Sequence, residues 1–160
     1  MRHHFNNINL SIFLIAIVIV LSYPKFSFGL FESKGQITIA TTDGKLQNFD
    51  VEFARSDAEK AIGLMFRERL ADDEGMLFMW NTSSLRQFWM KNTLINLDIL
   101  FINSDYRVVH IEDNAKKGSS RIISSILPIQ YVLEINAGQS QLRKITPGAL
   151  LSSKNLPICC

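Results

Sequence analysis

The chain has 160 residues, of which 47% are hydrophobic and 20% are charged, and its formal net charge is +2. Arg2 and Lys25 precede all 15 acidic residues, which leaves 15 of the 17 basic side chains to balance them in the rest of the chain. A balanced chain of this length fits one domain, and its longest basic run, Lys116-Lys117, gives no basis for a nucleic-acid-binding or polybasic membrane-binding surface.

The amino-terminal segment has the pattern of a secretory signal. An almost wholly apolar run, Leu10–Leu21, follows a short polar stretch and is ended by Ser22–Pro24. The run is shorter than the ~20 residues that span a bilayer. We predict a signal peptide over residues 1–29, cut after Gly29, with an uncleaved anchor as the alternative. Both interpretations place the domain outside the cytoplasm, in the periplasm or cell envelope, and an uncleaved leader is the only membrane contact that we expect.

The first elements after the leader are a hairpin and a helix. Apolar residues alternate in Gln36–Thr41 and in Leu46–Ala54, and an Asp-Gly turn lies between these two strands. Ser56-Asp57-Ala58-Glu59 has the spacing of a capping box, and an apolar stripe at helical period follows it. Gly63 weakens the end of this helix, or lets its backbone lie close to a sheet.

The rest of the chain reads as short strands separated by turns. Gly75–Trp80 is continuously apolar, which predicts a strand buried on both faces. Further strands are predicted at Arg86–Met90, Leu97–Ile102, Arg107–Asp113, Gln130–Asn136 and Ala149–Leu151. The segment Asn114–Pro128 is the least regular, and Gln139–Ile145 could form one helical turn. We therefore predict a mainly β fold: a single small β-sandwich or barrel-like domain over residues 30–151, with one short helix and a flexible tail at 152–160.

The two cysteines, Cys159 and Cys160, are adjacent at the carboxyl end. Neighbouring cysteines rarely bridge each other, because the bond strains the peptide between them. The domain core thus has no disulfide. A frayed tail and an intermolecular or metal-binding role for the pair both remain open.

Four motifs occur in one order along the chain. They are Gly63-Leu64-Met65-Phe66-Arg67, Gly75-Met76-Leu77-Phe78, Phe88-Trp89-Met90-Lys91-Asn92-Thr93 with Leu97-Asp98-Ile99, and Tyr131-Val132-Leu133-Glu134 with Gly138. In these motifs the chain resembles the prokaryotic domain-of-unknown-function family number 192, over about Gln36–Leu151. The resemblance implies a compact, mainly β, often exported domain, and no established activity, cofactor or catalytic residue. Many relatives carry a cysteine pair in the loop matching Asn114–Pro128; this chain has none there, so a redox or metal role based on that pair does not apply.

Polar side chains inside the apolar runs mark a candidate ligand-binding centre. A charge in such a place must be paired or must reach water, because burying it alone costs several kcal/mol. Asp98 could be a general base or ligand acceptor in a cleft, or a clamp that bonds the Asn92–Asn96 connection, with Lys91, Arg67 and the Asn92 amide as its candidate partners. We favour the clamp. The candidate ligand-binding residues are Arg67, Trp89, Lys91, Asn92, Asp98 and Glu134.

Two sets of these residues also suggest specific chemistry. Trp89 with Lys91 and Asn92 could form a platform for a sugar ring, although a core tryptophan is the commoner case. Glu134 and Asp98 could form a carboxylate pair for glycoside or ester hydrolysis, which requires both groups in one cleft. The methionines with His110 could bind copper, but we favour them as core residues.

These observations favour a non-enzymatic, exported module of the cell envelope that binds a glycan or a small polar ligand, with no cofactor and no metal. No nucleophile motif, phosphate loop or zinc spacing supports an enzyme. Two alternatives remain. One is a small hydrolase that uses Asp98 and Glu134. The other is a domain that docks on a membrane-protein partner through the loop Asn114–Pro128.

Overall fold

The computed structural model describes residues 33–152, 154, 156 and 157. The predicted leader at 1–29 and the pair Cys159 and Cys160 lie outside these residues. Leu156, in the segment predicted to be a flexible tail, packs against the core of the domain.

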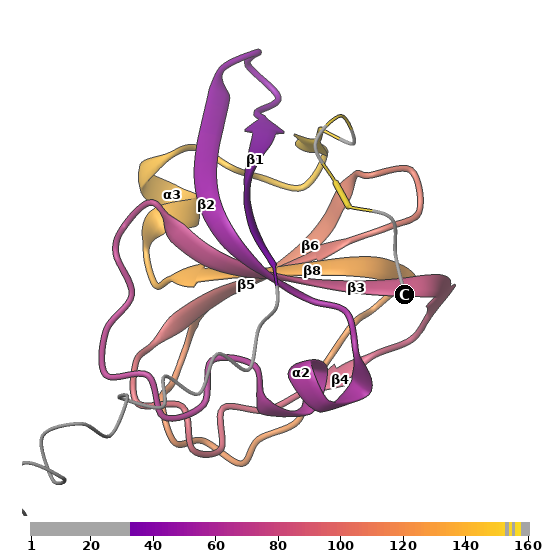
Figure 1. Ribbon diagram of the computed structural model, residues 1–160. Coiled ribbons are helices and arrows are strands. Elements are labelled where there is room, and N and C mark those ends of the chain that lie inside the picture. Colours follow the sequence, from indigo (N-terminus) through magenta and orange to yellow (C-terminus); the bar gives the residue numbers. More distant parts are fainter. Residues whose placement is uncertain (1–32, 153, 155, 158–160) are drawn as a thin grey trace, which may run out of the picture.

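The domain is built on one strongly curled sheet (Figure 1). Its strands lie in the order β6-β5-β8-β3-β2-β1-β9, and only β2 and β3 run parallel. A bridge between Arg107 and Leu150 brings its two edges together, which confirms the predicted mainly β, barrel-like fold. The strands are β1 (Lys34–Ala40), β2 (Leu46–Ala54), β3 (Glu74–Ser84), β5 (Leu97–Ile102), β6 (Val108–Ala115), β8 (Ile129–Asn136) and β9 (Leu150–Leu151).

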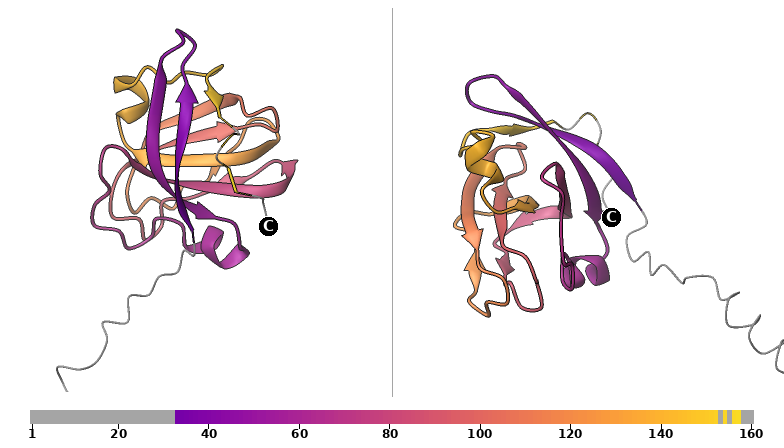
Figure 2. Two further views of the ribbon diagram at one scale, coloured as in Figure 1. Left: turned by 45° about the horizontal axis from the view of Figure 1, so that its top comes forward. Right: turned by 90° about the vertical axis from the view of Figure 1, so that its left-hand side faces the viewer.

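A second, two-stranded sheet pairs β4 (Gln87–Phe88) with β7 (Ile123–Ser124). The strand predicted at Arg86–Met90 is thus shorter than expected, and part of the irregular segment Asn114–Pro128 is its partner. The described residues form two short helices: α2 (Asp57–Ile62), which was predicted, and α3 (Gln139–Leu142), within the segment that could form one helical turn. The views in Figure 2 place α2 at one end of the sheet, and α3 with the β1–β2 turn at the other.

The predicted capping box begins α2. Ser56 Oγ accepts a hydrogen bond from Glu59 N at 3.2 Å, and Glu59 Oε2 accepts one from Ser56 N at 2.7 Å. Gly63 ends the helix with φ of 51°. A Cβ at Gly63 would lie 3.1 Å from the ring of Phe78 on β3. The glycine therefore lets α2 lie close on the sheet, one of the two roles proposed from the sequence.

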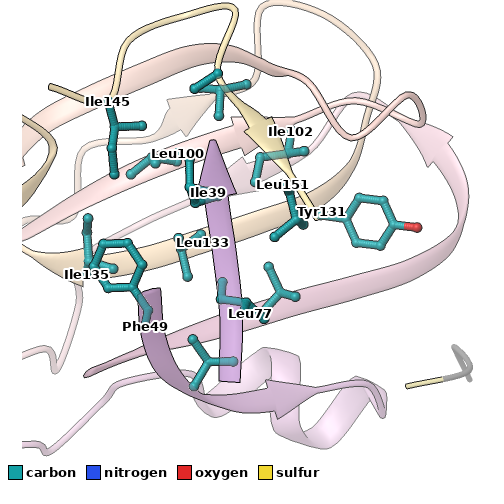
Figure 3. Close-up of a cluster of buried hydrophobic side chains, with 14 of the residues drawn as sticks. Ile39, Phe49, Leu77, Leu100, Ile102, Tyr131, Leu133, Ile135, Ile145 and Leu151 are labelled. Atoms are coloured by element: carbon teal, nitrogen blue, oxygen red, sulfur yellow. The ribbon is translucent and has the colours of Figure 1, made fainter. Parts of the chain in front are cut away.

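The sheet has a hydrophobic core on each face, because apolar side chains fill both sides of its central strands. Leu77 and Met79 of β3 point into an inner core inside the curl, where side chains of β1, β2, β5 and β8 meet (Figure 3). Met76 and Phe78 of the same strand point into an outer core that includes Leu64 from the segment after α2. The prediction that β3 is buried on both faces is confirmed. Because Met76 and Met79 lie on opposite faces, they cannot share a copper ion.

Gly75 on β3 marks the closest approach of two strands. A Cβ there would lie 2.7 Å from the Glu134 carbonyl oxygen and 3.1 Å from Ile135 Cγ2. Backbone atoms of a central strand cannot move aside, so we expect Gly75→Ala to lower the free energy of unfolding by ~1–3 kcal/mol. Urea denaturation measures this change. Ser83→Ala, at an exposed position of the same strand, is the control; an equal loss in both variants would contradict the proposed clash.

Candidate functional site

A pocket of about 660 Å³ lies over the outer core, between α2, β3 and β4. The end of β3 supplies Trp80, and the segment around β4 supplies Arg86, Phe88 and Trp89. Lys60 of α2 and Leu64 close the other side, and Glu134 of β8 lies in the wall. Side chains from four distant parts of the sequence therefore meet in this pocket.

Aromatic rings form one wall of the pocket. The ring of Phe78 stacks with that of Trp80 at 6.3 Å between centroids. Phe88 meets both of them edge to face, at 5.6 Å from Phe78 and 6.2 Å from Trp80. Such edge-to-face packing fixes the rings relative to one another. This wall is therefore a preformed apolar surface.

Two cations lie against the indole of Trp80. The Arg86 guanidinium is 4.6 Å from the ring centroid, and Lys60 Nζ is 5.4 Å from it. Arg86 Nη2 donates to the carbonyl oxygen of Thr82 at 3.1 Å, whereas its Nε is buried and has no hydrogen-bond partner among the described residues. Burial lowers the pKa of Arg86 below its ordinary value. Lys60 Nζ also forms an ion pair with Asp57 Oδ1 at 3.5 Å.

Glu134 places a carboxyl group among apolar neighbours. Its cross-strand partners on the outer face are Met76 and Ile99. Only 5% of the residue is exposed, and among the described residues no side chain forms a hydrogen bond or ion pair with its carboxyl group. Burial raises its pKa from 4.5 to about 8, so Glu134 is mostly protonated at neutral pH. A protonated carboxyl both donates and accepts hydrogen bonds, which suits a neutral polar ligand.

Two other glutamates in the same row across the sheet are paired with arginines, unlike Glu134. Glu52 forms ion pairs with Arg67 and with Lys34, the latter at 3.1 Å. Burial raises the pKa of Glu52, but the two cations outweigh that effect and its pKa is below the ordinary value. Glu112 pairs with Arg121.

Trp89 lies at the pocket with its side chain in contact with solvent. It is 48% exposed, so it is not the core tryptophan that was the commoner expectation. Lys91 Nζ lies 5.6 Å from the Trp89 ring centroid, as the proposed platform requires. Asn92 instead shapes the backbone: its φ is 61°, and its carbonyl oxygen accepts a hydrogen bond from Phe66 N at 2.8 Å. Of the three residues of the predicted platform, Trp89 and Lys91 therefore lie together, and Asn92 holds the turn beside them.

Asp98 lies away from this pocket, on the inner face of β5. Its Oδ1 accepts a hydrogen bond from Asn114 N at 2.9 Å. Its Oδ2 accepts bonds from Gly138 N at 2.9 Å, Ser140 N at 3.0 Å and Ser140 Oγ at 2.7 Å. The residue is fully buried. Asp98 therefore acts as a clamp, as predicted, but it holds the end of β6 and the turn after β8. The hydrogen bonds predicted from Asp98 to the Asn92–Asn96 connection, and its predicted pairing with Lys91 or Arg67, are not formed.

The structure separates the six predicted ligand-binding residues into three places. Trp89 and Glu134 line the pocket near α2, and Lys91 lies against the Trp89 ring, followed in the chain by Asn92. Arg67 belongs to a groove between β1 and β2 and pairs there with Glu52. The prediction that these residues form a single polar centre is therefore wrong.

Asp98 and Glu134 cannot act as a catalytic pair. Glu134 is the cross-strand partner of Ile99, so the preceding residue, Asp98, points to the opposite face of the sheet. The two carboxyl groups also line different pockets. This placement rules out the hydrolase that was predicted to use both groups in one cleft.

Sequence reasoning missed Lys60, Trp80 and Arg86. Trp80 ends an apolar run and was assigned to a buried strand, while Arg86 was assigned to the next strand. The usable signal was the short spacing between Trp80 and Arg86, since β3 runs on to Ser84 and β4 begins at Gln87. Among residues 33–152 and the described tail positions, no three His, Cys, Asp or Glu side chains are grouped to hold a metal ion. In the same part of the chain, no helix is long and apolar enough to span a bilayer.

A family model, DUF192, described as an uncharacterised ACR, matches residues 38–153. No curated protein matches the chain. A solved structure from Sinorhizobium meliloti, described as a candidate transcription regulator, is 38% identical with a TM-score of 0.74; the match covers 75% of this chain and 93% of that one. A protein of unknown function from Novosphingobium aromaticivorans is 40% identical with a TM-score of 0.72, over 74% of this chain and 84% of that one.

Proposed function

The chain belongs to the uncharacterised DUF192 family, and from that premise we propose that it is an exported, non-enzymatic domain of the cell envelope that binds a small polar ligand, a glycan being the first candidate. The export part of the proposal rests on the amino-terminal pattern, an apolar run at Leu10–Leu21 followed by Ser22–Pro24. The balanced charge after Lys25 gives no reason to extend the regulator description of the Sinorhizobium meliloti relative to this chain.

One observation carries the ligand-binding proposal: a pocket of about 660 Å³ combines an exposed indole, an aromatic wall and a protonated carboxyl. The volume is in the range of pockets that bind small molecules. An indole face such as that of Trp89 stacks against the apolar face of a sugar ring. Hydroxyl groups of the same ring can bond to Glu134, Arg86 and Lys60 as donors and acceptors.

The chain's own tryptophans report on this pocket. Trp80 and Trp89 are the only two in the sequence, and both line it. Titrating the protein with envelope glycan fragments should therefore give a saturable change in tryptophan fluorescence. No response across the panel would remove the glycan version of the proposal.

Trp89→Ala is expected to weaken glycan binding about tenfold or more, because one face of the stacking platform is lost. Isothermal titration calorimetry measures this without relying on the removed fluorophore. Phe66→Ala is the matched control: Phe66 is 66% exposed but does not line the pocket. Equal weakening in the two variants would show that the ligand binds elsewhere.

A further inference from the structure

Two loops at the α2 end of the sheet form one continuous surface. They comprise residues 85–96 and 116–128, and we call them the two-loop surface. The pairing of β4 with β7 joins them. Three backbone bonds add to it: Met90 N to Ser119 O at 3.0 Å, Gly118 N to Thr93 O at 3.0 Å, and Ser125 N to Arg86 O at 2.8 Å. The surface is thus held in one shape by backbone hydrogen bonds.

The two-loop surface concentrates exposed apolar side chains. Of the ten large hydrophobic residues that are exposed in the described part of the chain, six lie on it. Scattered single residues of this kind are ordinary, but a gathered set marks an interaction site. The six are Leu85, Trp89, Leu94, Ile122, Ile126 and Leu127.

The same surface carries cations and no acidic residue. Residues 85–96 contain Arg86 and Lys91, and residues 116–128 contain Lys116, Lys117 and Arg121. Arg121 is paired with a glutamate of β6 outside the two loops. The overall charge balance of the sequence did not indicate this group of cations, because the acidic residues that balance them lie on other elements.

We propose that the two-loop surface docks the domain on an anionic lipid bilayer. Apolar side chains mixed with lysine and arginine are the chemistry by which proteins lie in a membrane interface, and tryptophan prefers that depth. If the surface bound a protein, Lys91 would lie near the centre of the interface, because it lies beside Trp89. Lysine is depleted at the centre of protein–protein interfaces. The composition of the surface therefore favours lipid over the membrane-protein partner that was considered from the sequence. On this proposal, the two-loop surface is a second membrane contact besides the leader.

The path of the chain agrees with this orientation. The described chain begins at Ser33, whose carbonyl oxygen accepts a hydrogen bond from Phe53 N at 3.1 Å. Phe53 is near the end of β2 that leads into α2, on the side of the two-loop surface. The apolar run of the leader ends at Leu21, twelve positions before Ser33. The described chain thus begins at the same end of the domain as the two-loop surface.

The test uses the fragment from Leu30 to Cys160 and protein-free vesicles. This fragment includes every strand, and the solved relative from Sinorhizobium meliloti shows that the domain forms with little else, since 93% of that chain is matched. We expect it to co-sediment with vesicles of phosphatidylethanolamine and phosphatidylglycerol, and to be released as salt screens the cations. Vesicles of phosphatidylcholine alone should bind it more weakly.

A double variant, Ile126→Ser with Leu127→Ser, should weaken vesicle binding about tenfold or more, because these side chains supply the buried apolar area. The matched control is Leu46→Ser with Leu142→Ser, which changes two similarly exposed residues at the opposite end of the domain. Thermal unfolding of both variants shows whether each remains folded.

Absence of binding to the anionic vesicles, or equal losses in the two double variants, would overturn the proposal. Binding to native membranes but not to protein-free vesicles would also overturn it and would indicate a protein partner. Glu134→Gln separates a failure of the proposed ligand site from a failure of the membrane proposal. This substitution changes the pocket wall but neither of the two loops, so vesicle binding should be unchanged in that variant. A loss there would contradict a docking surface built from the loops alone.

Discussion

Asp98→Asn is expected to lower the free energy of unfolding by about 3 kcal/mol or more, since hydrogen bonds to charged groups contribute ~1.5–3 kcal/mol and an opposed buried donor adds a further cost. Donors approach the carboxylate from both sides. Asn114 N reaches Oδ1, whereas Gly138 N and both Ser140 groups reach Oδ2. An asparagine must turn its amide NH₂ toward one of these sides, where donor faces donor. Both turns that Asp98 holds should loosen together.

Urea and thermal denaturation at neutral pH measure this loss, and Asp105→Asn is the control. Asp105 is an exposed carboxylate in the turn between β5 and β6, and its change should be near zero. Stability unchanged or increased in Asp98→Asn would mean that the buried carboxylate is strained for a function and is not a clamp.

The second large effect is a dependence of stability on pH through Glu134. The carboxyl has a pKa of about 8 in the folded protein against 4.5 for the ordinary group. Between these values the folded state holds a proton that the unfolded state has lost. The contribution of Glu134 to the free energy of unfolding should therefore be largest below about pH 4.5, fall by up to ~1.4 kcal/mol per pH unit as pH rises, and level off above about pH 8.

Glu134→Gln removes this titration while keeping the shape of the side chain. Its free energy of unfolding should exceed that of the parent protein at pH 8 and lose most of the slope between pH 5 and 8. Denaturation curves across this range make the comparison. Glu68→Gln, at an exposed position, should keep the parent slope. Parallel curves for the parent and Glu134→Gln would show that Glu134 is solvated or paired in solution.

The sequence allowed the local structure to be predicted well, because its signals act over short distances. The bounds of the strands at 46–54 and 97–102 and the capping box at Ser56 follow from alternation and spacing alone. The curled, mainly β fold follows from many short strands with few helices.

The position of the site could not be predicted, because it depends on which strands are neighbours. β8 lies between β5 and β3, and the register between β5 and β8 decides that Glu134 faces the side of Ile99 and not that of Asp98. Nothing local in the sequence encodes this register. Likewise, Arg67 in the connection after α2 pairs with Glu52, fifteen positions earlier on β2.

The two edges of the curled sheet meet only through the end of the chain. The segment around β9 pairs with β1 on one side, through Ile39 and Leu151, and bonds on the other side to Val108, whose N donates to Ala149 O at 2.9 Å. Without this segment, backbone groups at the end of β1 and the start of β6 would be unpaired, and unpaired strand edges are the feature that recruits strands from other molecules. The domain can therefore cover these two strand ends only after β9 has been synthesised, so a chain that still lacks β9 is expected to aggregate more readily than the finished fold.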